Sequence, residues 1–94
     1  GDKEAEEKFK EVQQAYVNAK AAYSKYLAEE KSVDAARKAF EFEQKKFDNG
    51  TSTSYQFNEV RQKLETATSQ MYQAKYSFLL RAKILDFYKG EPLY

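Results

Sequence analysis

The stretch that decides the fold is FDNGTST, residues 47–53, because it separates two long segments that both carry a helical pattern. Gly50 can adopt the left-handed backbone conformation that ends a helix at little steric cost. Thr53 can accept a free backbone amide at the start of a second helix, and Gln56 three residues later completes a T-x-x-Q capping box. The stretch therefore predicts a tight turn between two antiparallel helices.

The helical pattern on both sides of this turn is broken again only at Gly90 and Pro92. We therefore predict an all-α fold: a long antiparallel two-helix coiled-coil hairpin that forms a single unit over residues 1–94. The expected elements are a helix over about residues 3–48, a turn at 49–53, a helix over about 54–89 and a C-terminal tail at 90–94.

Composition excludes several classes of function. The 94 residues carry 16 basic and 15 acidic side chains, so the chain lacks the electrostatic footprint of a nucleic-acid-binding protein. The sequence contains no cysteine and no histidine, which excludes disulfides, thiolate metal sites and imidazole catalysis. No catalytic constellation is recognisable, and we expect no enzyme activity, no cofactor and no metal. The charged start of the chain, residues 1–8, is expected to be the cut end of a fragment.

Both helices carry a heptad pattern, with seam positions spaced by alternating threes and fours. In the first helix the expected seam is Phe9, Val12, Tyr16, Ala19, Tyr23, Tyr26, Glu30, Val33, Arg37, Phe40, Gln44 and Phe47. In the second helix it is Phe57, Val60, Leu64, Ala67, Met71, Ala74, Phe78, Arg81, Leu85 and Tyr88. A repeat of 3.5 residues predicts left-handed supercoiling.

Folding the chain back at Gly50 predicts the pairs across the seam. These pairs are Phe47 with Phe57, Phe40 with Leu64, Val33 with Met71, Tyr26 with Phe78, and Ala19 with Leu85. The polar seam residues are expected to set the register, with Arg81 stacked on the ring of Tyr23. On the surface, pairs such as Glu59 and Lys63 have the i, i+4 spacing of helical salt bridges.

A second stripe lies on nearly the opposite side of the first helix. Its members are Val17, Ala21, Ser24, Ala28, Lys31, Ala35, Lys38 and Phe42, and the second helix shows a similar tendency at Tyr72, Tyr76 and Leu79. Small residues let another helix approach closely, so a helix with two such faces suits a closed tube or a multi-helix bundle. The alternative is that the alanines only raise helix propensity.

The turn and the C-terminal segment together resemble a known family. FDNGTST followed by FNEV, residues 57–60, resembles the periplasmic tip of TolC-type outer-membrane efflux proteins, which have an aromatic residue, two residues, glycine, two residues and then Ser or Thr. QAKYSFLL at 73–80 and KILDFY at 83–88 resemble the end of the second structural repeat in Bacteroidetes-like members. The resemblance covers roughly residues 8–94.

This resemblance implies a periplasmic helical hairpin of a trimeric outer-membrane channel in a Gram-negative bacterium. In such systems a periplasmic adaptor and an inner-membrane transporter dock at the tip, and substrates leave through the channel. The implied docking tip consists of Phe47, Asn49, Gly50, Thr51, Ser52 and Thr53, and the implied pore-lining positions are Gln56 and Glu59. Because Ser52 and Gln56 are neutral where a charge is often found, the resemblance argues against a charge-based gate.

Two other functions remain open at this point. One is a stand-alone interaction hairpin similar to the secreted WxG-type proteins, although the chain has no tryptophan. The other is a coiled-coil chaperone or scaffold arm that binds along its length. In any of these settings the exposed second stripe predicts that the isolated chain self-associates.

Overall fold

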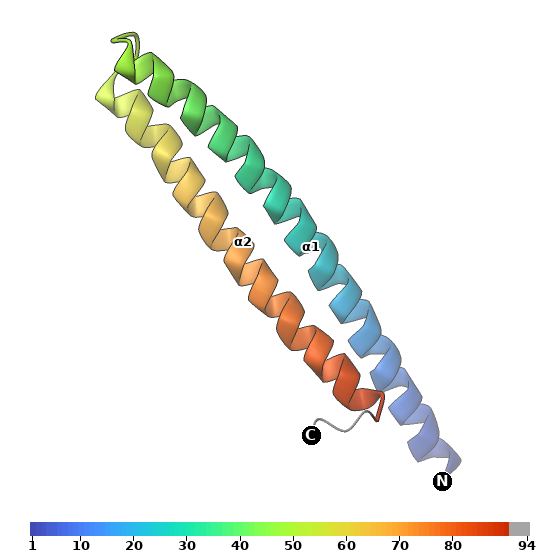
Figure 1. The fold of residues 1–94 in the computed structure, drawn as a ribbon. Helices are drawn as coiled ribbons and strands as arrows, with labels where there is room; N and C mark the ends of the chain where they lie inside the picture. The colour runs from blue at the N-terminus through green and yellow to red at the C-terminus, as the bar shows by residue number, and fades with distance from the viewer. Residues whose placement is uncertain (91–94) are drawn as a thin grey trace. The chain divides into compact units, whose positions relative to one another are not determined.

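The computed structural model describes residues 1–90, and every element within them is helical. Helix α1 spans Asp2–Asp48, helix α2 spans Ser54–Tyr88, and the turn at 49–53 joins them (Figure 1). The predicted all-α helical hairpin is confirmed. Pro92 and the other tail residues at 91–94 lie outside the described residues.

Composition explains why both helices run so far without a break. Their interiors contain no glycine and no proline, and they are rich in Ala, Lys, Glu and Gln, which favour helix. In α1 the first turn carries acidic Asp2 and Glu4 and the last turn carries basic Lys45 and Lys46, so charge complements the helix dipole at both ends.

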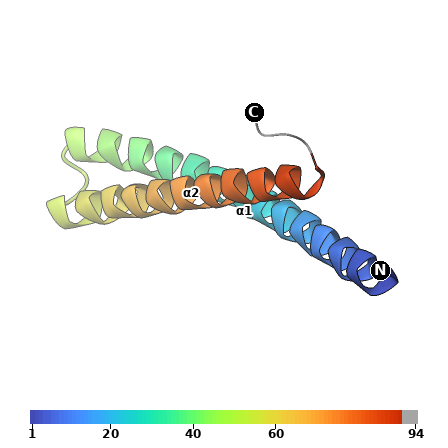
Figure 2. The same cartoon turned by 90° about the horizontal axis from the view of Figure 1, so that it is seen from below.

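The chain divides into two compact units, and each helix contributes to both. Figure 2 shows the two helices from below, coloured by residue number. One unit is Leu27–Gln73 and contains the turn; the other joins Gly1–Tyr26 with the described part of Ala74–Tyr94. Each unit is an antiparallel pair of helical segments, and we describe each by itself.

The unit that contains the turn is held together by aromatic rings and a buried valine. The ring of Phe57 lies 5.0 Å from that of Phe47 and 5.3 Å from that of Phe40. Farther from the turn, Val33 is buried and lines the same surface hollow as Met71. The predicted pairing of Phe47 with Phe57 is confirmed, and Phe40 packs on Phe57 as well.

The other unit combines one aromatic cluster with buried alanines. The ring of Phe78 lies 5.0 Å from that of Tyr23 and 6.4 Å from that of Tyr26. Ala15, Ala19 and Ala74 are buried, so the two segments approach closely at these small side chains. The predicted pairing of Tyr26 with Phe78 is confirmed.

The seam of α1 differs from the prediction at every second position. The positions at seven-residue intervals (Val12, Ala19, Tyr26, Val33 and Phe40) are buried or half-buried, as expected. The positions between them are Ala15, Ala22, Glu29, Ala36 and Glu43, each one residue before the predicted Tyr16, Tyr23, Glu30, Arg37 and Gln44. Tyr16 is 54% exposed and Phe9 is 62% exposed, so both were wrongly assigned to the seam.

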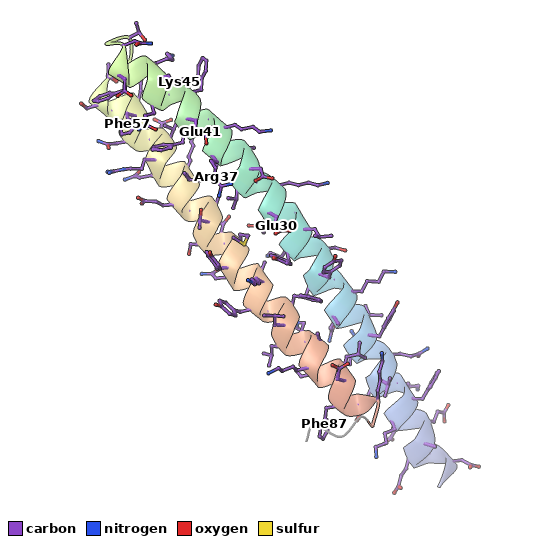
Figure 3. All side chains as sticks on the ribbon, viewed as in Figure 1. Glu30, Arg37, Glu41, Lys45, Phe57 and Phe87 are labelled. Atoms are coloured by element: carbon purple, nitrogen blue, oxygen red, sulfur yellow. The ribbon has the colours of Figure 1, made fainter. Side chains whose placement is uncertain are left out.

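This correction replaces the three polar residues predicted for the α1 seam with Glu29, Ala36 and Glu43. Glu30, Arg37 and Gln44 are all exposed. Figure 3 labels Glu30 and Arg37 on α1. Arg37 forms an ion pair with Asp34 at 3.5 Å within its own helix. These residues therefore do not act as polar register markers, and the prediction that they do is wrong.

The seam of α2 follows the prediction as far as Phe78 and then changes phase. Ala82 is half-buried there, whereas Arg81 is exposed, and Leu85 is half-buried again. Steps of four, four and three residues in this region form a stutter, which locally unwinds a left-handed supercoil. Arg81 lines a surface hollow with Ala15, and the ring that packs on Tyr23 is Phe78, so the predicted stacking of Arg81 on Tyr23 is wrong.

Candidate functional site

The turn begins with a Schellman motif that ends α1. The Gly50 amide donates a hydrogen bond to the Phe47 carbonyl at 3.0 Å, and the Thr51 amide donates to the Lys46 carbonyl at 2.8 Å. The Thr51 hydroxyl donates to the same Lys46 carbonyl at 3.0 Å. Gly50 has a φ of 76°, which is the left-handed conformation that the sequence predicted for it.

The turn ends with the predicted capping box. The Gln56 amide donates to Thr53 Oγ1 at 3.1 Å, and the Thr53 amide donates to Gln56 Oε1 at 3.3 Å. Two amides at the start of α2 are therefore satisfied by side chains. The carboxamide oxygen of Gln56, one of the two predicted pore-lining residues, is engaged in this box.

Ser52 lies between these two motifs and connects the turn to α1. Its Oγ lies 2.6 Å from Glu43 Oε1, the distance expected for a hydroxyl that donates to a carboxylate. The Glu43 side chain is only 13% exposed, and its Oε2 lies 3.7 Å from Lys46 Nζ. Lys46 Nζ also lies 5.6 Å from the centroid of the Phe42 ring. The Glu43 carboxylate therefore has one partner from the turn, Ser52, and one from α1, Lys46.

Most of the predicted tip residues are exposed at the turn. Asn49, Gly50, Thr51 and Thr53 are exposed, whereas Ser52 is half-buried and Phe47 packs its ring on Phe57. A Cβ atom placed on Gly50 would meet nothing within 4 Å. The glycine is therefore required by its backbone conformation, and the space beside it is open.

Sequence reasoning missed two residues at the turn. Glu43 was not singled out, although it lies four residues before Phe47 on the seam that the structure defines. Tyr55 is 77% exposed, and its side chain has neither a hydrogen bond nor a ring contact in the described part of the chain. Its position between Thr53 and Gln56 of the predicted capping box was the only signal in the sequence.

Glu59, the other predicted pore-lining residue, lies one turn beyond the capping box. Its Oε1 lies 3.5 Å from Lys63 Nζ, so the expected i, i+4 salt bridge is present. Its side chain is half exposed, which leaves the carboxylate accessible to solvent.

The faces of both helices that point away from the seams are exposed. All members of the second α1 stripe, from Val17 to Phe42, are exposed, and so are Tyr72, Tyr76 and Leu79 of α2. The exposed face of α2 also follows a three-four spacing. This face has a polar part and a mainly apolar part. Its positions are Gln62, Thr66, Ser69 and Gln73, followed by Tyr76, Leu80, Lys83 and Phe87.

The described residues offer no other chemistry that defines a site. Within residues 1–90, no group of three or more acidic, histidine or cysteine side chains could hold a metal ion. Over the same residues, neither helix is both long and apolar enough to cross a membrane. The capped turn and the two exposed helix faces are what the molecule presents.

A capped hairpin with a second exposed face on each helix suits a closed tube or a multi-helix bundle, as the sequence predicted. A model of the outer membrane efflux protein family matches residues 2–91, and the chain belongs to that family. Members are components of outer-membrane efflux channels, so the predicted resemblance to TolC-type proteins is confirmed. No curated protein and no solved structure gives a match to the chain.

Proposed function

We propose that the chain is a periplasmic helical hairpin of an outer-membrane efflux channel and that its turn docks a periplasmic adaptor. Family membership over residues 2–91 is the observation that carries this proposal. In the parent channel the hairpin belongs to a homotrimer and lies in the periplasm. The adaptor links the channel to an inner-membrane transporter. The function is transport and not catalysis.

The geometry of the turn supports docking at this point. The backbone of the turn is fixed by a Schellman motif on one side and a capping box on the other, so little conformational entropy is lost when a partner binds. Asn49, Gly50 and Thr51 are exposed, and the open space beside Gly50 lets a partner approach the backbone. We expect Thr53 to lie at the edge of the contact, because its hydroxyl is engaged in the capping box.

Pore lining is the second part of the proposal. Gln56 and Glu59 are the candidates, and Glu59 is the one whose charge faces solvent. Because Gln56 is neutral and engaged in the cap, a constriction at this turn rests on bulk and hydrogen bonding more than on a ring of charges.

The docking proposal can be tested by site-specific photo-cross-linking in cells that produce the parent channel. A photoreactive residue in place of Thr51 is expected to cross-link to the adaptor. The matched control replaces Lys3, which is exposed and lies in the first turn of α1, at the end of that helix opposite to the turn. An adaptor cross-link at Lys3 but not at Thr51 would contradict docking at the turn and would favour an arm that binds along its length.

A further inference from the structure

We propose that the Ser52 hydroxyl and the Glu43 carboxylate form a clasp that holds the turn in one conformation. The clasp is a property of this chain alone, and only its consequence for docking rests on the proposed function. Neither residue is part of the Schellman motif or the capping box. The clasp is therefore a third and separate constraint on the turn.

The turn has a gap between its two backbone motifs, and Ser52 occupies it. The Schellman motif fixes the chain as far as Thr51, and the capping box fixes it from Thr53 onward. The Ser52 side chain is the group that ties this middle residue to a helix. Without it, the backbone at Ser52 would be restrained only through its two neighbours.

The distances identify Glu43 as the main acceptor of the Ser52 hydroxyl. Oγ of Ser52 lies 2.6 Å from the Glu43 carboxylate but 3.4 Å from both Gln56 Oε1 and the Thr53 carbonyl. A hydroxyl has one hydrogen to donate, and a bond to a charged acceptor is stronger than a bond to a neutral one. The two longer distances describe alternative acceptors that Ser52 can turn to when Glu43 is removed.

The surroundings of Glu43 explain why its carboxylate stays at the turn. The side chain is 13% exposed, and a charge with so little access to water requires partners. Lys46 Nζ supplies the countercharge at 3.7 Å, and Ser52 supplies the hydrogen bond. When the hydroxyl is lost, Glu43 gains by rotating toward water, and the link between α1 and the middle of the turn opens.

The clasp can be tested by NMR-detected hydrogen exchange on this chain, with no partner present. In Ser52→Ala and in Glu43→Gln, the hydrogen-bonded amides of the turn are expected to exchange about three- to tenfold faster, because local opening becomes easier. The amides to follow are those of Thr51, Thr53 and Gln56, with Val33 inside α1 as the internal reference. The double variant is expected to exchange no faster than Ser52→Ala, because Ser52→Ala removes the link that Glu43→Gln weakens by removing the charge of the acceptor.

Ser54→Ala is the matched control, since Ser54 is the next serine along the chain, is exposed, and its side chain forms no hydrogen bond within residues 1–90. It should leave exchange at the turn unchanged, and Ser52→Thr should retain the wild-type rates. Equal rates in Ser52→Ala and Ser54→Ala would overturn the clasp, as would additive effects in the double variant. Because no adaptor takes part, failure here leaves docking at the turn unaffected, and failure of the cross-linking experiment leaves the clasp unaffected.

Discussion

The ring of Phe47 lies 5.0 Å from the ring of Phe57, with the two planes 25° apart, so the end of α1 packs directly on the start of α2. Phe40, one heptad before Phe47 in α1, packs on the same Phe57 ring. Aromatic packing between the helix ends therefore stabilises the turn, while hydrogen bonds fix its backbone. This arrangement separates residues that stabilise the turn from residues that it presents.

Truncation of the central ring should destabilise the hairpin. Phe57→Ala removes the partner of both Phe40 and Phe47 and is expected to lower the free energy of unfolding by about 2–4 kcal/mol. Tyr55→Ala, two residues away and 77% exposed, should change it by less than about 0.5 kcal/mol. Urea unfolding at one fixed protein concentration measures both, and equal losses would show that the aromatic cluster is not a core.

Gly50 should be sensitive to backbone conformation and insensitive to side-chain volume. Gly50→Ala is expected to cost about 1–2 kcal/mol, because a residue with a Cβ is strained at a φ of 76°. Gly50→Asn should cost less, since asparagine tolerates this conformation and its side chain meets open space. Thermal unfolding compares the two variants. A greater loss for asparagine would indicate crowding at Gly50.

The capping box should contribute a measurable part of the stability. Thr53→Ala removes the oxygen that accepts from the Gln56 amide and is expected to cost about 0.5–2 kcal/mol. Thr53→Ser retains that oxygen and serves as the control. Circular dichroism during urea unfolding follows the loss, and identical curves for the two variants would mean that the cap is dispensable.

The corrected α1 seam can be tested by charge insertion at adjacent positions. Ala15→Lys introduces a charge at a site that is only 7% exposed, and we expect a loss of at least about 2 kcal/mol. Tyr16→Lys, one residue later and 54% exposed, should cost less than about 1 kcal/mol. Denaturant midpoints of the two variants decide which residue lies in the seam, and the reverse order would restore the predicted one.

Self-association should depend on the apolar part of the exposed α2 face. The chain alone is expected to dimerise or form a four-helix bundle at high concentration, because contiguous exposed apolar surface drives association. Leu80→Glu with Phe87→Glu should shift it toward monomer, since both side chains are more than half exposed. Gln62→Glu with Gln73→Glu adds the same charge to the polar part of that face and should leave association unchanged. Sedimentation equilibrium at high micromolar concentration measures both, and a strictly monomeric wild-type chain would contradict the prediction.

The fold was predictable because the residues that end α1 and start α2 act locally. Half of the α1 seam positions were not predictable in this way. From Val12, Ala19 and Tyr26, the intermediate position can be either three or four residues on. Side-chain size favoured Tyr16 over Ala15, yet the structure uses the alanine. Ala15 lines a surface hollow with Arg81, Ile84 and Tyr88, so the small side chain of α1 faces longer side chains of α2. Choosing between the two spacings requires both helices at once, which a single-helix pattern does not provide.

At the candidate site, too, local features were predictable from the sequence and a longer-range contact was not. The Gly50 conformation and the box between Thr53 and Gln56 follow from residue chemistry at fixed spacing, and both are present. The contact between Ser52 and Glu43 spans nine residues and depends on how the turn folds back on α1. No local rule predicts such a contact, because it forms only after the Schellman motif has set the direction of the chain.

The hydrogen bonds that shape the turn join residues within one continuous segment, 43–57. Because the hydrogen bonds of the turn are confined to this segment, the segment can be transplanted into another antiparallel hairpin without changing the rest of that sequence. The long helices can then differ in length and surface while the turn keeps its form. On the proposed docking function, swapping this segment between related hairpins is expected to exchange partner preference separately from assembly.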